Sequence, residues 1–419
     1  MVRIAIIGLG QRGTDVLRNV ILKIKDAEVA ALCDEYEDRY KSAVELVRSE
    51  KGYEPYGTED YREILKNDMV DAVIVCTAWE THVDIAVDAM RAGKYVGIEA
   101  GGAYAIEDCW QLVRTSEETG VPCMLLENCC YTRREMMCLN MAKIGAFGEI
   151  IHCEGGYHHD LRYEIAFGKQ NRHYRLRNYL NRNCENYPTH ELGPIAKLLN
   201  INRGNRMLSL VSMASKSVAL HNYVNFKEGA DEELKDVSFA QGDVVTTIIR
   251  CAGGETITLT LDTTLPRTYS RGFTVHGTKA YFEEATDSVF TDISNNFDGD
   301  VDWGKFDWAN AKENADRYAE KYEHPLWKKY SNEKIEGGHD GGDWLVYNAF
   351  VESVASGSDF PIDVYDAAVL MSITALSEDS VAMGGTPVAI PDFTRGKWLK
   401  PKKQNLVEKY RLDKIPNIK

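Results

Sequence analysis

The first 127 residues alternate short apolar runs with segments of helical periodicity. The apolar runs, which suit buried strands, lie at residues 4–7, 28–34, 70–77, 94–99 and 122–127. Between them, apolar positions recur at helical spacing over residues 16–24, 81–92 and 106–119. Strands that alternate with helices in this way predict an α/β fold, a doubly wound parallel Rossmann sheet with its ligand beyond the carboxyl ends of the strands.

From about residue 148 the pattern changes to alternating polar and apolar positions. This alternation predicts half-buried strands at 149–157, 244–251, 256–262 and 273–277. Helical patterns lie at 343–356 and 365–383, and the polar stretch 284–342 is expected to form long loops and short helices over one edge. We therefore expect a C-terminal α+β domain with a mostly antiparallel sheet. The expected units are a Rossmann domain, a substrate domain and a tail, at 1–127, 128–395 and 396–419.

Composition and charge narrow the class of partner. The 419 residues are 44% hydrophobic and 27% charged, and the formal net charge is −15. Such an acidic chain repels phosphate backbones and anionic lipid, and no apolar run nears the roughly 20 residues that span a bilayer. We expect a small-molecule substrate, a homo-oligomer, and neither nucleic-acid nor membrane binding.

The N-terminus and the cysteines predict a reducing compartment. The chain opens on an apolar strand, without the basic and apolar regions of a secretory signal. The ten cysteines include no C-x-x-C pair and no disulfide-framework spacing. We therefore expect reduced, buried cysteines and a cytoplasmic protein.

A dinucleotide-binding fingerprint follows the first strand. Gly8-x-Gly10-x-x-Gly13 opens a helix, and the second strand ends in an acidic residue 21 positions later. Gly8 permits the tight turn, Gly10 lets the backbone approach the pyrophosphate, and Gly13 lets helix and strand pack closely. At the helix start, Gln11 and Arg12 are expected to offer free backbone N–H groups to the phosphates.

The acidic residue, Asp34, bears on the choice of cofactor. Its carboxylate can accept hydrogen bonds from both hydroxyls of the adenosine ribose and would repel a 2′-phosphate, so we expect NAD rather than NADP. Further cofactor contacts are expected where other strands end. The nicotinamide ribose and amide are assigned to Glu99, Glu127 and Asn128, and the adenosine side to Thr77, Trp79 and His82.

A Rossmann domain followed by an antiparallel α+β domain resembles the glucose-fructose oxidoreductase/inositol dehydrogenase/MocA superfamily over essentially the whole chain. Five segments in order are similar to glycoside hydrolase family 109, the NAD-dependent α-N-acetylgalactosaminidases. They are Glu127-Asn128-x-x-Tyr131, Gly155-Gly156-Tyr157-x-His159-Asp160-Leu161-Arg162, Asn183-x-x-x-Tyr187-Pro188-Thr189-His190-x-Leu192-Gly193-Pro194, the run 200–206 and Pro391-Asp392-Phe393. Dehydrogenases of the superfamily typically carry Glu-Lys-Pro after the fourth strand, where this chain has Glu99-Ala100-Gly101. The missing lysine favours family 109.

The resemblance implies glycoside hydrolysis by an unusual route. Ordinary glycosidases use two carboxylates that flank the scissile bond. Here C3 of the sugar would be oxidised to a ketone, which acidifies the C2 proton. Loss of that proton expels the C1 substituent, water adds at C1, and C3 is reduced again. This route requires general bases near C2 and C3 and an acid near the leaving oxygen, and it needs no metal.

The segment Tyr187-Pro188-Thr189-His190 is the first choice for this acid–base work. Pro188 stiffens the loop, and a helix expected at 193–199 places His190 near a helix start, facing a cleft. The helix dipole there would favour a neutral imidazole that can accept a proton. The resemblance implies that Tyr187 and His190 are both catalytic and substrate-binding.

Tyr157 and His159 lie two positions apart on one expected strand, so both side chains point to the same face of the sheet. The resemblance implies proton transfer by both, and which of them serves C2 and which C3 is left open. It also implies that Arg175 and Tyr269 bind the substrate. A guanidinium can fix sugar hydroxyls or an acetamido carbonyl through paired hydrogen bonds. Tyr174 stands where the family usually has a tryptophan, and the loop before it is shorter.

The sequence bears on two other functions and on a metal site. A net sugar oxidoreductase acting at C3 is disfavoured by the missing lysine, and an NAD- or sugar-sensing module is disfavoured by the group of tyrosines and histidines. The glycine-rich loop 337–343 carries donors that suit a metal, namely His339, Asp340 and Asp343. Three donors on one loop are weak evidence, and we predict no metal.

Overall fold

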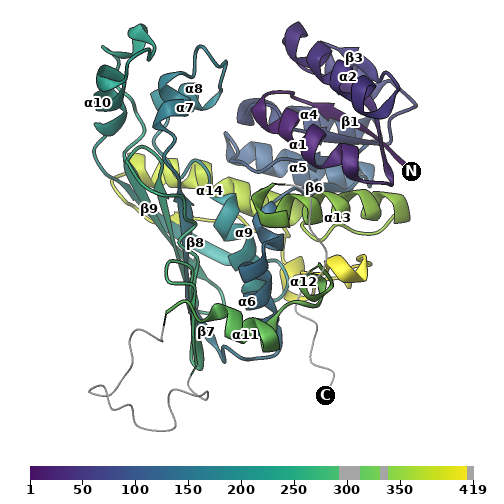
Figure 1. The fold of residues 1–419 in the computed structure, drawn as a ribbon. Coiled ribbons are helices and arrows are strands. Elements are labelled where there is room, and N and C mark those ends of the chain that lie inside the picture. The colour runs from purple at the N-terminus through teal and green to yellow at the C-terminus, as the bar shows by residue number, and fades with distance from the viewer. Residues whose placement is uncertain (292–311, 331–337, 413–419) are drawn as a thin grey trace.

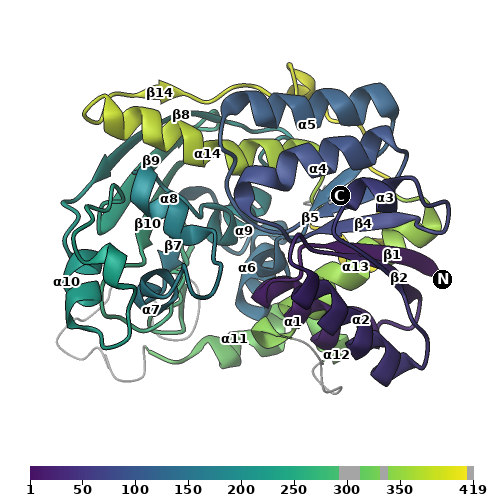
Figure 2. The same ribbon diagram turned by 90° about the horizontal axis from the view of Figure 1, so that it is seen from above.

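The computed structural model describes residues 1–291, 312–330 and 338–412, which form two sheets, the first packed between helices and the second covered by helices on one face (Figures 1 and 2). The first sheet has the order β3-β2-β1-β4-β5-β6, and every neighbouring pair is parallel. The strand order reverses between β1 and β4, which is where open α/β sheets bind their ligands. The strands are β1 (Val2–Ile7), β2 (Ala27–Cys33), β3 (Tyr56–Thr58), β4 (Ala72–Val75), β5 (Tyr95–Ile98) and β6 (Cys123–Leu125).

This sheet confirms the predicted Rossmann fold. Central strands such as β1 and β4 are covered on both faces, which is why they appear in the sequence as unbroken apolar runs. Ile4, Ile6, Val73 and Val75 are fully buried. The helices of this part are α1 (Gln11–Asn19), α2 (Glu37–Lys51), α3 (Tyr61–Leu65), α4 (Trp79–Arg91) and α5 (Ile106–Thr119).

The second sheet has the order β13-β12-β11-β7-β10-β9-β8-β14. All neighbouring pairs are antiparallel except β7 with β10, which are parallel, so the prediction of a mostly antiparallel sheet is confirmed. The sequence did not indicate β8, β12, β13 or β14. The strands are β7 (Ile150–His158), β8 (Met207–Ala214), β9 (Val244–Cys251), β10 (Thr256–Asp262), β11 (Thr274–Gly277), β12 (Ala280–Glu283), β13 (Ser288–Thr291) and β14 (Val388–Ala389).

Helices cover one face of the second sheet and connect it to the first. Helix α9 packs on β7, α14 packs on both β8 and α5, and α13 reaches β1 (Figure 1). The shorter helices α7, α8 and α10 gather at one end of the second sheet. The helices of this part are α6 (Arg133–Lys143), α7 (Arg162–Ala166), α8 (Arg175–Asn181), α9 (Thr189–Leu198), α10 (Ala219–Phe226), α11 (Ala315–Tyr322), α12 (Pro325–Tyr330), α13 (Gly342–Ser356) and α14 (Val364–Ala382).

The stretch expected to form long loops, 284–342, is described only in part. It contains β13, α11, α12 and a short 3-10 turn at His339–Gly341, while residues 292–311 and 331–337 lie outside the described residues. Among the helices that are described, none has the length and apolar character needed to cross a membrane.

Candidate active site

The turn between β1 and α1 has the geometry that a dinucleotide requires. Gly8 adopts a φ of +94°, and a Cβ there would lie 2.6 Å from the carbonyl carbon of Cys76. A Cβ on Gly13 would lie 1.9 Å from the carbonyl oxygen of Gly8, so both positions require glycine. At Gly10 the nearest atom to such a Cβ is 3.6 Å away, which leaves that side of the turn open. A cavity of about 410 Å³ lies here, lined by Leu9, Gly10, Gln11, Thr14, Asp15, Arg18, Asn19 and Arg39.

Asp34 is held beside this turn by two backbone hydrogen bonds. Its carboxylate accepts the N–H of Leu9 at 2.6 Å and the N–H of Tyr36 at 3.0 Å. Each carboxylate oxygen has a second lone pair, so both ribose hydroxyls can still be accepted. The turn, the open side of Gly10 and this fixed carboxylate together fit NAD.

The residues expected to cover the adenosine lie in two different surroundings. His82 is buried with Nε2 2.9 Å from the carbonyl oxygen of Thr77, and burial lowers the pKa of His82 to about 4. The neutral ring therefore secures the start of α4. Trp79 packs against Tyr174 and Tyr187, with ring centroids 4.9 and 5.5 Å away. It thus lies among rings of the second domain, and the cavity beside Gly10 is lined by other residues.

Arg12, Glu99 and Asn128 belong to one hydrogen-bonded group at the carboxyl ends of β1, β5 and β6. Nη2 of Arg12 lies 3.0 Å from Oε1 of Glu99. Arg12 also donates to both oxygens of Asp343, and Asn128 donates to Oδ1 of the same carboxylate at 2.8 Å. Sequence reasoning considered Asp343 only as a metal donor, because nothing local links it to partners 331 and 215 positions away.

The proposed acid–base residues meet in one ring cluster, which we define as Tyr157, His159, Tyr187, His190 and Tyr269. The hydroxyl of Tyr157 lies 2.9 Å from Nδ1 of His159. The Tyr187 ring centroid lies 4.5 Å from that of Tyr157 and 4.7 Å from that of His190. Tyr269 completes the cluster: its ring centroid lies 5.2 Å from that of His159, and its side chain is half exposed to solvent. Residues far apart in the chain thus pack into one cluster.

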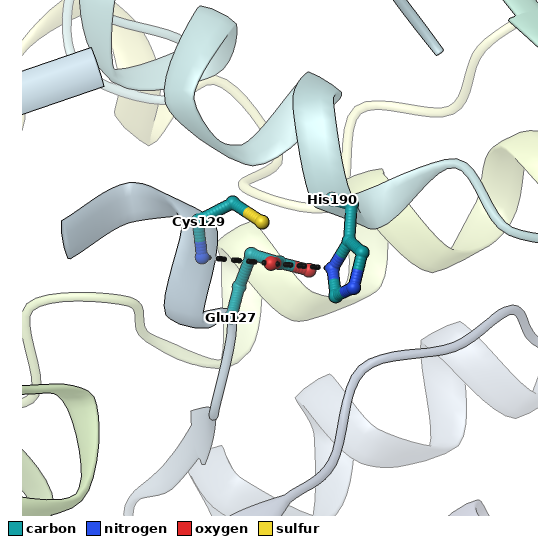
Figure 3. Close-up of side chains that lie close together, drawn as sticks. All are labelled: Glu127, Cys129 and His190. Atoms are coloured by element: carbon teal, nitrogen blue, oxygen red, sulfur yellow. Dashed lines mark hydrogen bonds and ion pairs between the residues drawn. The ribbon is translucent and has the colours of Figure 1, made fainter. Parts of the chain in front are cut away.

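His190 is paired with a carboxylate that the sequence had assigned to the nicotinamide ribose. Nδ1 of His190 lies 2.8 Å from Oε1 of Glu127, which also accepts the N–H of Cys129 at 3.1 Å (Figure 3). Burial opposes the charge on Glu127, but the His190 ring and further hydrogen bonds hold the pKa of that carboxyl below its ordinary value. The pair therefore consists of a carboxylate and an oriented imidazole.

The local structure around His190 differs from the expectation. Helix α9 starts at Thr189 rather than at 193, so His190 lies within its first turn and Pro194 lies inside the helix. His190 is only 7% exposed, so it lies in a buried site rather than on an open cleft wall. Proline fits the first turn of a helix, where its missing N–H costs nothing, and Pro188 precedes α9 directly.

Three donors that suit a metal lie together in the described part of the chain. Atoms of Glu127, Cys129 and His190 all fall within 4.8 Å of one another. The carboxylate is already bonded to the imidazole and to a backbone N–H, and burial raises the pKa of the Cys129 thiol well above its ordinary value. A protonated thiol is a poor ligand. The loop donors His339 and Asp343 bind each other at 2.8 Å.

Arg175 lies beside the ring cluster with its charge compensated. Nη1 of Arg175 donates to Oε1 of Glu164 at 2.6 Å, and its guanidinium lies 5.3 Å from the ring centroids of both Trp79 and Tyr187. Burial opposes ionisation of Glu164, but Arg175 and His173 hold its pKa below the ordinary value. Sequence reasoning missed Glu164, because it and Arg175 lie on two separate short helices.

Comparisons with known proteins agree with this arrangement. Residues 2–126 match an oxidoreductase family with an NAD-binding Rossmann fold, and residues 131–400 match the C-terminal domain of glycosyl hydrolase 109. An α-N-acetylgalactosaminidase of Tannerella forsythia is 38% identical, with 95% of this chain and 87% of that protein covered. A family 109 protein of Stenotrophomonas maltophilia is also 38% identical, with 95% and 90% covered.

Solved structures show the same fold at low identity. A levoglucosan dehydrogenase in complex with NADH and levoglucosan has a TM-score of 0.65 at 18% identity, with 93% of this chain and 100% of that chain covered. An oxidoreductase domain protein of Kribbella flavida has a TM-score of 0.67 at 16% identity, with 94% and 100% covered. Given the match over residues 131–400 and the identity to the relatives, the chain belongs to glycosyl hydrolase family 109 and carries an NAD-binding Rossmann domain.

Proposed function

We propose that this NAD-dependent glycosidase hydrolyses N-acetylgalactosaminides or related glycosides. The observation that carries the proposal is the ring cluster beside the strand ends of the Rossmann sheet, with His190 bonded to Glu127 at 2.8 Å. Two carboxylates beside the ring cluster, Glu127 and Glu164, are each engaged by a basic partner. They are therefore poorly suited to the paired carboxylate chemistry of ordinary glycosidases.

When bound, NAD supplies hydride transfer at C3 of the sugar, in both directions, so hydrolysis consumes no cofactor. The protein must then move protons at three places: the C3 hydroxyl, C2 and the leaving oxygen on C1. As the C2 proton is removed, its electron pair forms the C1–C2 double bond and the C1–O bond breaks. Water then adds at C1, and a proton returns to C2. Each proton needs an acceptor or donor within hydrogen-bond reach.

His190 and Glu127 form one such proton acceptor. Because Glu127 accepts a hydrogen bond at Nδ1, that nitrogen carries the proton and Nε2 is left as the basic atom of the ring. The carboxylate also stabilises the imidazolium that forms when Nε2 takes a proton, as an acid does beside a catalytic histidine elsewhere.

Tyr157 and His159 form the second proton acceptor. Burial lowers the pKa of His159, which keeps the ring neutral, and burial raises the pKa of Tyr157. A neutral Nδ1 can accept the phenolic proton across 2.9 Å, so the pair can pass a proton from the sugar toward the partly exposed His159. Tyr157 and His159 act as one unit, and Tyr187 lies between them and His190 at 4.5 Å from the Tyr157 ring. Which unit serves C2 and which C3 is left open.

Arg175 and Tyr269 are proposed to bind the sugar. Arg175 is buried beside Trp79 and Tyr187, and a neutral acetamido carbonyl suits a guanidinium whose charge Glu164 already compensates. Tyr269, half exposed at the edge of the ring cluster, is placed to contact the sugar at the entrance. Gln11, Arg12, Asp34 and the strand-end residues Thr77, Glu99 and Asn128 are proposed to hold NAD.

The test is the reaction of the purified protein with an aryl α-N-acetylgalactosaminide, followed in two absorbance channels. A glycosidase of this type releases phenol without accumulating NADH. Accumulation of NADH without phenol would establish the alternative, a net sugar oxidoreductase. If neither phenol nor NADH appears, with NAD bound and several aryl glycosides tried, the result would contradict both functions.

Cytoplasmic location and self-association are also proposed. All ten cysteines are free, and nine of them are buried, which suits a reducing compartment. Among the described residues, Met213 on β8 and Ile248 on β9 are exposed on the same face of the second sheet, and such apolar side chains favour contact with a second copy. Light scattering after size-exclusion chromatography tests the oligomer.

A further inference from the structure

Asp343, in the first turn of α13, is a fully buried carboxylate that gathers donors from distant parts of the chain. Arg12 donates to its two oxygens at 2.9 and 2.7 Å, Asn128 donates at 2.8 Å, and Nδ1 of His339 lies at 2.8 Å. A buried carboxylate is costly unless it is paired and fully hydrogen-bonded. Four bonds to one side chain therefore mark a position where the conformation is tightly fixed.

The partners of Asp343 lie at the strand reversal and on the β5–β6 side of it. Arg12 follows β1, Asn128 follows β6, and Glu99, which Arg12 also binds at 3.0 Å, follows β5. The hydroxyl of Tyr347, one turn further along α13, donates to the same oxygen of Glu99. Asp34, which holds the adenosine end, lies after β2 on the other side of the strand reversal. Apart from Arg12, which lies at the reversal itself, the cofactor residues of the group thus lie in the half of the site that would receive the nicotinamide.

The loop before α13 directs His339 back toward Asp343. His339, Asp340 and Gly341 have consecutive φ values of 51°, 52° and 90°, a left-handed conformation that non-glycine residues rarely adopt. The bond from His339 to Asp343 spans this turn and stabilises it. The second domain therefore supplies both the carboxylate and a loop held against the start of α1, where Gly338 lies beside Asp343 and Asp15.

We propose that Asp343 is a positioning residue for the nicotinamide half of NAD: it fixes Arg12 and Asn128 from the second domain, and through Arg12 it fixes Glu99. The inference rests on the cofactor site of the proposed function. Without the carboxylate, Arg12 keeps Glu99 at 3.0 Å and Asp15 at 3.9 Å as partners, and the Asn128 amide loses the acceptor of its 2.8 Å hydrogen bond. The ordering of both groups would then have to occur when NAD binds, which weakens binding.

The experiment compares the affinity of two ligands for three proteins stripped of nucleotide. The ligands are NAD and AMP, because AMP occupies only the adenosine half. The proteins are the wild type, Asp343→Asn and a matched control, Asp366→Asn. Asp366 is also buried in the first turn of a helix and also binds an arginine through both oxygens, but its partners Arg203 and Lys197 are not proposed cofactor residues.

We expect Asp343→Asn to weaken NAD binding about 10- to 100-fold, the range for losing charge-assisted hydrogen bonds, with AMP binding within about twofold of the wild type. Asp366→Asn should leave the ratio of the two affinities unchanged. Unchanged NAD binding in Asp343→Asn, or equal loss of NAD and AMP, would overturn the proposal.

A second variant covers the case in which Asp343→Asn does not fold. His339→Gln changes a half-exposed side chain and should weaken NAD binding several-fold without affecting AMP; no selective loss there would count against the proposal as well. Failure of the wild type to bind NAD would instead refute the proposed function. If the wild type binds NAD and releases phenol while the variants bind NAD with normal affinity, only the role of Asp343 would be refuted.

Discussion

Nδ1 of His190 and Oε1 of Glu127 lie 2.8 Å apart although the residues are 63 positions apart in the chain. Glu127 ends the last stretch of the Rossmann domain, and His190 lies in the first turn of α9 in the second domain. The bond therefore joins the two parts of the protein at the point where the nicotinamide and the sugar would meet. Gly193 makes it possible, because a Cβ there would lie 2.8 Å from Cγ of Glu127.

Replacing His190 should stop turnover but not cofactor binding. His190→Ala removes the proposed base and is expected to lower kcat about 10²- to 10⁴-fold, the usual range for a positioned acid or base. NAD affinity, measured by fluorescence quenching, should stay close to that of the wild type. Glu127→Gln, which keeps the shape but loses the charge, should give a smaller loss. A normal rate in His190→Ala would remove it from the mechanism.

Asp34→Ala should weaken NAD binding more than sugar binding. The carboxylate is fixed by the N–H groups of Leu9 and Tyr36, so it is ready to accept both ribose hydroxyls. Loss of two charge-assisted hydrogen bonds costs about 2–4 kcal/mol, partly offset by solvent. Isothermal titration with NAD, and with a glycoside on the NAD-loaded protein, measures both affinities. Equal losses would place Asp34 outside the ribose site.

Gly101→Ala should disturb the sugar site through Trp79. A Cβ on Gly101 would lie 2.4 Å from Cδ1 and Nε1 of the indole, so the ring must shift and its contacts with Tyr187 and Arg175 change. We expect kcat/KM for the glycoside to fall about 10-fold or more, because small misplacements in an active site are costly. NAD affinity should change little. The double variant Gly101→Ala/Trp79→Phe makes room for the methyl group and should recover part of the loss; no difference between wild type and Gly101→Ala would contradict this coupling.

The same contact explains a feature that the sequence could show only as a departure. Dehydrogenases of the superfamily carry a lysine and a proline where this chain has Ala100 and Gly101. The structure shows that the missing side chain at 101 leaves space for the Trp79 indole. The sequence showed that this segment differs from that of the dehydrogenases, but not that the Trp79 indole would fill the space beside Gly101.

The pattern of the chain predicted the elements well where burial is one-sided or complete. The predicted strands at 244–251 and 256–262 have the observed bounds: polar and apolar residues alternate in TITLTLD, and VVTTIIRC is rich in the β-branched residues that favour strands. Strand β8 was missed: it reads MLSLVSMA, in which serines and apolar residues are not separated cleanly by face. Helix α9 starts at Thr189, four residues before the predicted start at 193, and Pro188 directly precedes it.

The members of the ring cluster were identified largely from the family resemblance, but their partners were not. Glu164 for Arg175, Glu127 for His190 and Asp343 for Arg12 all come from separate elements. Each is a long-range ion pair or hydrogen bond, and periodicity carries no information about such contacts. Only the folded chain brings these charges together.

Glu185 should make stability depend on pH. Burial raises its pKa to about 8, with a backbone hydrogen bond from Tyr187 as a smaller opposing effect. A carboxyl whose pKa is raised in the folded state contributes most stability below its ordinary value of 4.5, and this contribution is lost as the pH rises toward 8. Glu185→Gln mimics the protonated form, so it should gain on the order of 1–4 kcal/mol over the wild type at pH 9 and little at pH 4. Tm measured across this range gives the difference; parallel curves for the two proteins would show that Glu185 has an ordinary pKa. The exposed Glu233→Gln serves as the control.

The hydrolysis route itself makes a prediction that the carboxylate-pair mechanism of ordinary glycosidases does not share. If C3 is oxidised first and the C2 proton is then removed, that proton exchanges with solvent during turnover. In D₂O the free sugar should therefore carry deuterium at C2, which NMR detects as loss of the C2 proton signal. The same route makes the enzyme relatively indifferent to anomeric configuration, because the leaving group departs from a carbanion-like species rather than by in-line displacement. Aryl α- and β-glycosides of one sugar should then differ far less in rate than they do for a carboxylate-pair enzyme. Complete retention of protium at C2, together with strict selection of one anomer, would show that the ring cluster serves some other chemistry.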